Sequence, residues 1–358
     1  MTIRIAGREV GPGAPVYIVA ELSGNHNGDI GRAVALIHAA ADAGADAVKL
    51  QTYTADTLTI KSENPEFIVP GDGPWSGRTL YDLYQEAHTP WEWHPRLFAE
   101  ARSRGIAIFS TPFDSTAIEL LESLEVPAYK VASFELVDDH LLELVAARRK
   151  PVILSTGMAT RDEISHAVAV LQCGGADGVL LLRCTSSYPA PDAEMHLSTI
   201  PELARHTHCP VGLSDHSLGT TAPVLAVGLG ACFVEKHMTL KRSDGGVDSH
   251  FSLEPAEFAE LVRDVRRAEA MLGRPTFGAG VAEEGNTAFR RSLYLVEDVA
   301  AGEPLTARNV RSIRPGFGLS PRHRDAVLAS RAARAARAGT PISWDFLAPT
   351  GHADRRHD

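Results

Sequence analysis

The chain has 358 residues, of which 44% are hydrophobic and 22% are charged, and this ordinary globular composition excludes a disordered, collagen-like or disulfide-scaffold protein. Its formal net charge of -10 argues against nucleic acid or an anionic membrane as a partner, because proteins that bind those polyanions present basic surfaces. The four cysteines form no CxxC pair, so we expect them to be reduced and the protein to be cytoplasmic. The sequence shows neither a signal peptide nor an uninterrupted apolar stretch long enough to span a membrane.

Eight short apolar runs, rich in β-branched residues, recur along the first two thirds of the chain. They begin at Val16, Asp46, Ile106, Tyr129, Pro151, Val179, Pro210 and Cys232. Helix-patterned segments separate most of these runs, such as residues 29–44, which start with an aspartate and end with a glycine. This alternation predicts an α/β fold, a (β/α)8 TIM barrel, since an open Rossmann sheet would usually show fewer strands and a glycine-rich first turn that is absent here.

The domain boundaries follow from changes in pattern. Residues 52–95 are too long for an ordinary strand-to-helix connection and are rich in proline and glycine, so we expect an excursion over one barrel face, in the position of a lid. The last helical pattern ends at Gly273, and short strand-like runs separated by turns follow from Ser292. We therefore predict a barrel over residues 1–273, a linker over 274–290, a small domain over 291–348 and a flexible tail over 349–358.

Polar residues stand where every predicted barrel strand ends. Because a TIM barrel carries its active site at the carboxyl ends of its strands, these residues should meet on one face. They include Glu21, Lys49, Gln51, Thr111, Lys130, Ser133, Ser155, Tyr188, Ser214, His216 and His237. A single polar residue at a strand end is ordinary, because loops are polar, but eight strand ends in agreement predict a functional site.

Lys49 and Lys130 lie on predicted interior strands, where a lysine is costly unless something anionic pairs with it. A phosphate or carboxylate ligand would meet that need, with nearby hydroxyl groups as further donors. The structural alternative is that Lys49 and Lys130 form internal salt bridges with Asp46 and Glu135.

His216 and His237 close two successive predicted strands, which brings two imidazoles side by side. With only two histidines, water or substrate oxygens must complete a metal shell, and this favours an exchangeable Mn²⁺, Co²⁺ or Mg²⁺ ion acting as a Lewis acid. Glu21 is the carboxylate placed for proton transfer, and its alternative role is to pair with a barrel lysine.

Several motifs, taken in order, resemble the N-acetylneuraminate (sialic acid) synthase family. They are AELSGNHNG, VKLQTY, STPFD, YKVASFE, LSTGM, CTSSYP, GLSDHS, EKHMTL and GGVDSHFSLEP. The C-terminal RRSLY and IRPGFGLSP segments resemble the antifreeze-like (SAF) domain that follows the barrel in this family. Within the family, the AELSGNHNG, KVASFE and FSLEP spellings are most similar to pseudaminic acid synthases.

The resemblance implies condensation of phosphoenolpyruvate with an N-acetylated sugar, 2,4-diacetamido-2,4,6-trideoxy-L-altrose, to give pseudaminic acid and phosphate. It implies a divalent metal ion, most often Mn²⁺, on His216 and His237, with Glu21 as acid or base beside the reacting carbons. The phosphate and carboxylate of phosphoenolpyruvate would be held by Lys49, Thr111, Lys130, Ser133, Ser155 and Ser214. The sugar would face Gln51, Tyr188 and Asp248, and Arg314 of a domain-swapped homodimer would reach the partner subunit's site.

Three alternatives remain open at this stage. A family member acting on N-acetylmannosamine or on the legionaminic acid precursor would keep the barrel and change only the sugar contacts. A metal-dependent pyruvate aldolase would release no phosphate. A glycan-binding protein would need neither the two lysines nor the two histidines at the strand ends.

Overall fold

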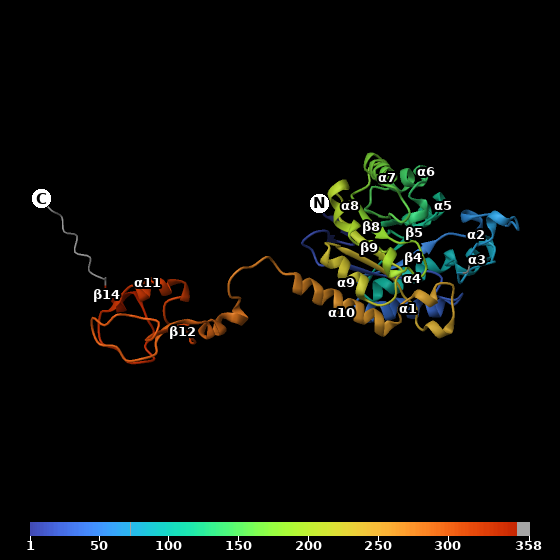
Figure 1. Ribbon diagram of the computed structural model, residues 1–358. Coiled ribbons are helices and arrows are strands. Elements are labelled where there is room, and N and C mark those ends of the chain that lie inside the picture. Colours follow the sequence, from blue (N-terminus) through green and yellow to red (C-terminus); the bar gives the residue numbers. More distant parts are fainter. Residues whose placement is uncertain (72, 349–358) are drawn as a thin grey trace. The chain divides into compact units, whose positions relative to one another are not determined.

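The computed structural model describes residues 1–71 and 73–348 (Figure 1). The predicted tail over 349–358 lies outside the described residues. The chain divides into two compact units, one from Met1 to Gly273 and the other from Arg274 onward. Each unit is described by itself.

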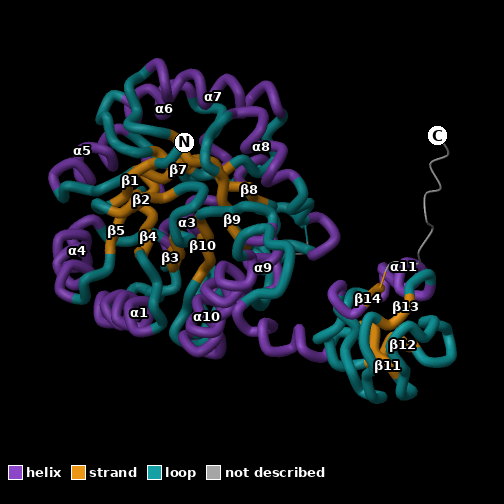
Figure 2. Tube along the Cα trace, turned by 90° about the vertical axis from the view of Figure 1, so that its left-hand side faces the viewer, coloured by secondary structure: helices purple, strands orange, loops and turns teal. Residues whose placement is uncertain are grey.

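The first unit is a closed barrel of eight parallel strands in the order β10-β3-β4-β5-β6-β7-β8-β9 (Figure 2). The strands are β3 (Tyr17–Glu21), β4 (Ala47–Thr52), β5 (Ala107–Pro112), β6 (Tyr129–Val131), β7 (Val152–Ser155), β8 (Val179–Cys184), β9 (Val211–Asp215) and β10 (Phe233–His237). Each overlaps one of the eight predicted apolar runs, so the predicted TIM barrel is confirmed. Consecutive strands are neighbours, and β10 closes the barrel by pairing with β3.

Helices surround the barrel (Figure 2). They are α1 (Ile30–Asp42), α4 (His94–Ser103), α5 (Ser115–Ser123), α6 (Asp139–Ala146), α7 (Arg161–Cys173), α8 (Thr199–Thr207), α9 (Thr221–Gly228) and α10 (Pro255–Leu272). The start of α1 is set by Asp29, whose side chain accepts hydrogen bonds from the first free backbone N–H groups of the helix. The buried residues of α1 are Ala33, Leu36, Ile37 and Ala40, a spacing that places one apolar face against the strands.

A short hairpin of β1 (Ile3–Ile5) and β2 (Arg8–Val10) precedes the barrel and is absent from the prediction. Its buried side chains join the cluster made by residues at the starts of the barrel strands, including Tyr17 and Phe233. The hairpin therefore packs on the amino-terminal end of the barrel, which leaves the carboxyl end for the functional residues. Three-residue strands are too short to give a readable alternation in sequence.

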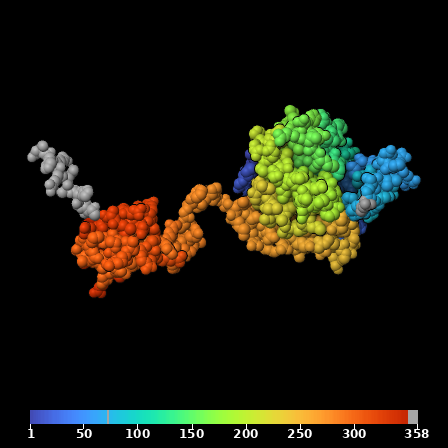
Figure 3. All heavy atoms as spheres, in the orientation of Figure 1, coloured from blue at the N-terminus to red at the C-terminus, as the bar shows by residue number. Residues whose placement is uncertain are grey.

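The excursion between β4 and β5 stands out from the barrel surface (Figures 1 and 3). It holds α2 (Ala55–Leu58), a 3-10 turn (Pro65–Phe67), α3 (Leu80–Ala87) and a second 3-10 turn (Trp91–Trp93) before α4. The indole N–H of Trp75 donates a hydrogen bond of 2.8 Å to the backbone oxygen of Val247, in the loop that follows β10. This contact ties the excursion to the carboxyl end of the barrel.

The second unit has its own hydrophobic core, which includes Leu293, Leu295, Ile342 and Phe346. Its elements are a 3-10 helix (Val281–Phe289), β11 (Ser292–Leu295), β12 (Val310–Ile313), α11 (Arg324–Leu328), β13 (Arg331–Ala332) and β14 (Leu347–Ala348). β11 pairs with β12 and β13 with β14, both antiparallel. In the part of the chain that the structure describes, no helix combines the length and apolar character needed to cross a bilayer.

Candidate active site

A cluster of buried ion pairs lies at the carboxyl end of the barrel. Lys49 on β4 places its Nζ atom 2.6 Å from Glu21 Oε2 at the end of β3 and donates a hydrogen bond of 3.2 Å to Thr111 Oγ1 on β5. Glu235 on β10 lies 3.5 Å from both Lys49 Nζ and Lys130 Nζ. None of the four charged side chains is more than 4% exposed, so they interact in a medium of low dielectric.

The two carboxylates of this cluster have pKa values shifted in opposite directions. Burial raises the pKa of Glu21, with a contribution from the neighbouring Glu235 and only partial compensation by Lys49. Burial acts the same way on Glu235, but Lys130 and Lys49 outweigh it and lower its pKa. Glu235 therefore stays ionised between the lysines, while Glu21 is the carboxyl suited to hold and move a proton.

The lysines differ as well. The carboxylates of Glu21 and Glu235 outweigh burial at Lys49 and raise its pKa. At Lys130, burial dominates and lowers the pKa, because Glu235 compensates only in part. Lys130 is therefore the buried cation short of a negative partner, which a phosphate or carboxylate group would supply.

Three serines surround the lysines at the ends of β6, β7 and β9. The backbone N–H of Gly157 donates to Ser133 Oγ at 3.0 Å, and Ser214 Oγ donates to Glu235 Oε1 at 3.3 Å. Ser155 Oγ is buried without a hydrogen-bond partner among the described residues. An unpartnered buried hydroxyl is costly, so its presence at this point favours a site completed by a ligand.

The two predicted imidazoles lie side by side, with 5.3 Å between the ring centroids of His216 and His237. His216 Nδ1 lies 3.0 Å from the backbone oxygen of Thr185, which can only accept, so Nδ1 carries a proton and Nε2 is the nitrogen left for a ligand. Burial lowers the pKa of His216, but Cys184 and Thr185 outweigh it and raise the pKa. His237 Nδ1 is buried and has no hydrogen-bond partner among the described residues. Burial, reinforced by the nearby His216, holds the pKa of His237 well below its usual value and keeps the ring neutral.

This donor set fits a metal ion that takes part of its shell from other molecules. Within residues 1–71 and 73–348, no group of three or more histidine, cysteine, aspartate or glutamate side chains is arranged to hold a metal ion by itself. Two adjacent imidazoles, each with a nitrogen that bonds to none of the described residues, suit an ion whose remaining ligands are water and substrate oxygens. His216 and His237 would hold it.

The predicted sugar-facing residues border the same cluster. Gln51 Nε2 donates to Glu21 Oε1 at 3.1 Å. Asp248 accepts a hydrogen bond from Ser23 Oγ, and its Oδ2 lies 3.9 Å from His237 Nδ1. Burial raises the pKa of Asp248 to about 6. The ring of Tyr188 lies 4.4 Å from that of His216, so the barrel gathers all the predicted site residues except Arg314, which belongs to the second unit.

The alternative prediction, that Lys49 and Lys130 form salt bridges with Asp46 and Glu135, is wrong because both lysines pair with other carboxylates. Asp46 pairs with Arg8 and Arg266 at the amino-terminal end of β4, and Lys49 pairs with Glu21 and Glu235 instead. Asp46 precedes β4 and Lys49 is its third residue, so they lie at different heights in the barrel.

Glu135 is also wrong as the predicted partner, because Lys130 pairs with Glu235. Glu135 makes no ion pair with the described residues, and burial raises its pKa to about 7.

The sequence reasoning missed Glu235 and the partner of Lys236. Along β10, side chains alternate between the two faces of the sheet, so Glu235 and His237 share the inner face while Lys236 points outward. There Lys236 pairs with Asp215 of β9, beneath the helices, and donates to the backbone oxygen of Ser217. Side chains alternate along a strand with a period of two, so the sequence Glu235-Lys236-His237 already places Glu235 and His237 on one face and Lys236 on the other.

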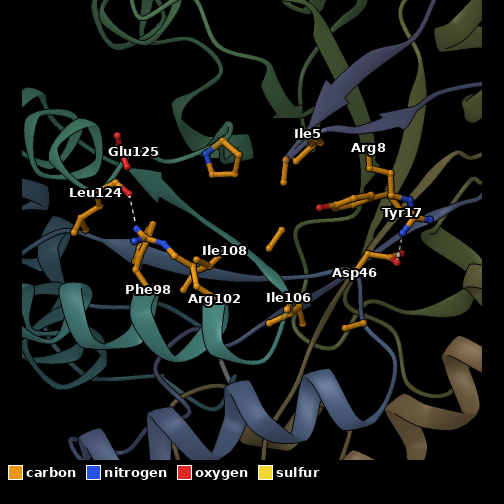
Figure 4. A pocket seen from close by; sticks show the side chains of 15 residues that line it. Ile5, Arg8, Tyr17, Asp46, Phe98, Arg102, Ile106, Ile108, Leu124 and Glu125 are labelled. Atoms are coloured by element: carbon orange, nitrogen blue, oxygen red, sulfur yellow. Dashed lines mark hydrogen bonds and ion pairs between the residues drawn. The ribbon is translucent and has the colours of Figure 1, made fainter.

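A separate cavity of about 530 Å³ lies at the amino-terminal end of the barrel (Figure 4). Arg8, Tyr17, Asp46 and Arg102 are among its lining residues, and Figure 4 shows the Arg8–Asp46 ion pair at one side. None of the predicted site residues lines it. We therefore place the active site by its chemistry, at the opposite end of the strands.

Comparisons with known proteins agree with this arrangement. The NeuB family model matches residues 36–276, and the SAF domain model matches residues 290–348. A pseudaminic acid synthase of Campylobacter jejuni is 43% identical over 319 residues, which covers 89% of this chain and 93% of the relative. A pseudaminic acid synthase of Helicobacter pylori is 41% identical over 335 residues, covering 93% and 98%.

Relatives with other names match at lower identity. An N,N'-diacetyllegionaminic acid synthase of Legionella pneumophila is 37% identical over 92% of this chain and 94% of its own. The crystal structure of N-acetylneuraminic acid synthetase from Leptospira borgpetersenii is 33% identical, with a TM-score of 0.71 over 80% of this chain and 95% of that one.

A TIM barrel with this cluster at its mouth and an SAF domain behind it defines the class of protein. The chain belongs to the NeuB family, the sialic acid synthase family, and among the named relatives above it is most similar to the pseudaminic acid synthases.

Proposed function

We propose that the protein condenses phosphoenolpyruvate with 2,4-diacetamido-2,4,6-trideoxy-L-altrose to give pseudaminic acid and phosphate. The observation that carries the reaction type is the cluster of Lys49 and Lys130 at the barrel mouth. Lys130 has Glu235, at 3.5 Å, as its ion-pair partner among the described residues, and Lys49 shares that carboxylate, so a phosphate or carboxylate group of a substrate would find two buried ammonium groups to pair with. The sugar is supported by the 41% to 43% identity to three pseudaminic acid synthases.

The chemistry assigns work to each part of the site. Carbon 3 of phosphoenolpyruvate bonds to the aldehyde carbon of the sugar, water adds at carbon 2, and the bond between carbon 2 and the phosphate oxygen breaks. The lysines and hydroxyls hold the phosphate and carboxylate and set carbon 3 near the aldehyde, which supplies orientation. The carboxyl of Glu21 gives a proton to the forming sugar oxygen or takes one from the water.

We propose that His216 and His237 hold a divalent ion, Mn²⁺ in preference to Co²⁺ or Mg²⁺. When bound, such an ion supplies Lewis acidity at the aldehyde oxygen. The support is the pair of adjacent imidazoles described above, with Asp248 close to one of them.

We also propose a domain-swapped homodimer in which Arg314 of the partner subunit completes the sugar site. Exposed apolar side chains support an interface on each unit. On the barrel, Phe134, Met158 and Leu218 follow the carboxyl ends of β6, β7 and β9 and are 57% to 64% exposed. On the second unit, Phe289 and Phe317 are 61% and 71% exposed. A monomer would leave these large apolar side chains in water.

The four cysteines are free, and this supports the further proposal of a cytoplasmic location.

The test is phosphate release from phosphoenolpyruvate with Mn²⁺ and one of three sugars: the altrose sugar, its legionaminic counterpart, or N-acetylmannosamine. We expect release with the altrose sugar, together with a nine-carbon product of matching mass, and loss of release after chelation that added Mn²⁺ restores. Preference for another sugar would overturn the substrate. A carbon-carbon bond formed from pyruvate without phosphate release would favour an aldolase.

A further inference from the structure

We propose that Trp75 determines sugar specificity: its ring, backed by the buried Phe251, forms an apolar wall that receives the methyl group of a 6-deoxy sugar. The inference rests on the function proposed above and deepens it. Trp75 comes from the excursion between β4 and β5, and none of the motifs named above includes it.

The position of the Trp75 ring is fixed from two sides. Its indole N–H donates to the backbone oxygen of Val247 at 2.8 Å, directly before Asp248. Its ring centroid lies 5.4 Å from that of Tyr188 and 6.4 Å from that of Phe251. The excursion therefore contributes one large side chain to the barrel mouth.

Contacts between neighbouring aromatic rings connect the proposed metal ligands to Trp75. Phe251 is 1% exposed, and its ring lies 4.7 Å from that of His237 and 5.2 Å from that of Tyr188. The aldehyde end of a sugar would lie beside the imidazoles, so the far end of its carbon chain extends along these rings toward Trp75.

Neither ring of the wall offers a hydrogen bond to a hydroxyl group at that far end, and the neighbouring His250, whose ring lies 6.1 Å from that of Trp75, places its Nε2 atom 3.5 Å from the backbone oxygen of Tyr188. Phe251 has no polar atom, and the single donor of Trp75 is used by Val247. A hydroxyl placed against these rings loses its bonds to water and gains none, whereas a methyl group gains apolar contact. The polar side chains of the sugar site, Gln51 and Asp248, contact Glu21 and Ser23 instead.

The expected selectivity is moderate. An apolar pocket rejects an analogue that only adds a hydroxyl by on the order of 10- to 100-fold in kcat/KM. We expect the wild-type protein to prefer the 6-deoxy altrose sugar over its 6-hydroxy analogue within that range.

The experiment measures kcat/KM for both sugars with the wild type, Trp75→Ala and Trp75→Phe. In Trp75→Ala we expect the preference to shrink to less than about threefold, mainly through a higher KM for the 6-deoxy sugar, with the KM for phosphoenolpyruvate unchanged. Trp75→Phe keeps an apolar ring and should keep most of the preference. Ile60→Ala, at a 61% exposed position of the same excursion, is the matched control and should behave as the wild type.

A second measurement does not depend on turnover. We expect the 6-deoxy sugar to change the tryptophan fluorescence of the wild type and not that of Trp75→Phe. Equal loss of activity toward both sugars in Trp75→Ala, with the preference intact, would overturn the inference and leave Trp75 as a tether of the excursion. A wild type that releases phosphate with neither sugar would instead count against the proposed function.

Discussion

At the scale of single residues, burial and charge assign different tasks to chemically identical side chains. Glu21 and Glu235 both contact Lys49, yet the pKa of Glu21 is raised and that of Glu235 is lowered, because Glu235 lies near a second lysine, Lys130. The environment therefore separates a proton carrier from a permanent counter-ion.

We expect Glu21→Gln to lower kcat by about 10²- to 10⁴-fold, since it removes the proton carrier while conserving shape. Binding of phosphoenolpyruvate should change far less, because Lys49 and Lys130, the proposed anion-binding groups, remain in place. Steady-state kinetics measure both values. The control is Glu135→Gln, another partly buried carboxyl with a raised pKa that lies outside the ion pairs. A similar loss of kcat in both variants would contradict the role of Glu21.

At the scale of elements, the strands β9 and β10, which carry the proposed metal ligands, are joined by a contact on the opposite face of the sheet. Their register sets Lys236 against Asp215, and each of these residues directly precedes a proposed metal ligand in sequence. The buried pair is 1% and 0% exposed, so neither charge has water as a substitute partner.

We expect Lys236→Met to destabilise the barrel by about 3–5 kcal/mol, because it leaves the buried carboxylate of Asp215 without a positively charged partner. The double variant Asp215→Asn with Lys236→Met should recover most of that loss, since no uncompensated charge remains. Denaturant unfolding of the full chain measures the free energies. If the double variant is as unstable as the sum of both single variants, the pairing is not the source of the stability.

Two buried histidines anchor the excursion and its flanks, and they make stability depend on pH. His94 Nε2 lies 2.9 Å from Thr52 Oγ1 at the end of β4, and His26 Nε2 lies 3.3 Å from Thr89 Oγ1. Burial lowers the pKa of each histidine to about 4. Between pH 6.5 and 4 the unfolded chain therefore binds protons that the folded chain does not.

By linkage, stability falls as the pH drops through this window, by roughly 3 kcal/mol per histidine at pH 4. His94→Gln should be less stable than the wild type at pH 7 and should lose less stability on acidification. Urea unfolding at pH 7.5 and pH 4.5 measures the difference. Identical acid sensitivity of the two proteins would show that folding does not lower the pKa of His94.

At the scale of the whole molecule, the chain is two units with separate cores, and the proposed dimer lets one subunit complete the site of another. Arg314 follows β12, is exposed, and makes no hydrogen bond or ion pair with the part of the chain that the structure describes. Its guanidinium is free to meet a ligand. A residue supplied by the partner can be tested by mixing two variants that are each impaired, at a sugar concentration below the raised KM.

We expect Arg314→Ala to raise the KM for the sugar much more than that for phosphoenolpyruvate. Mixed subunits of Arg314→Ala and Glu21→Gln should regain about a quarter of wild-type activity, because half of the dimers are mixed and each of those has one complete site. Co-expression followed by the phosphate assay measures the recovery. No recovery, despite mixed dimers by mass, would contradict the swapped arrangement.

The sequence by itself determined the barrel and most of its site. Apolar runs that alternate with helices admit few folds, and a barrel of parallel strands brings all strand ends to one rim, so Glu21, Lys130 and His237 could be grouped without any coordinates. The small domain was visible through its turns and motifs.

Only the tertiary structure decided which side chains contact each other. Lys49 and Lys130 pair with Glu235 and not with the carboxylates closest in sequence, and Lys236 points outward and pairs with Asp215. Such contacts depend on the register and tilt of strands that are far apart in sequence, which a one-dimensional pattern does not encode. The same holds for Trp75, because a hydrogen bond across 172 residues places it at the barrel mouth, and local propensity cannot specify a contact of that span.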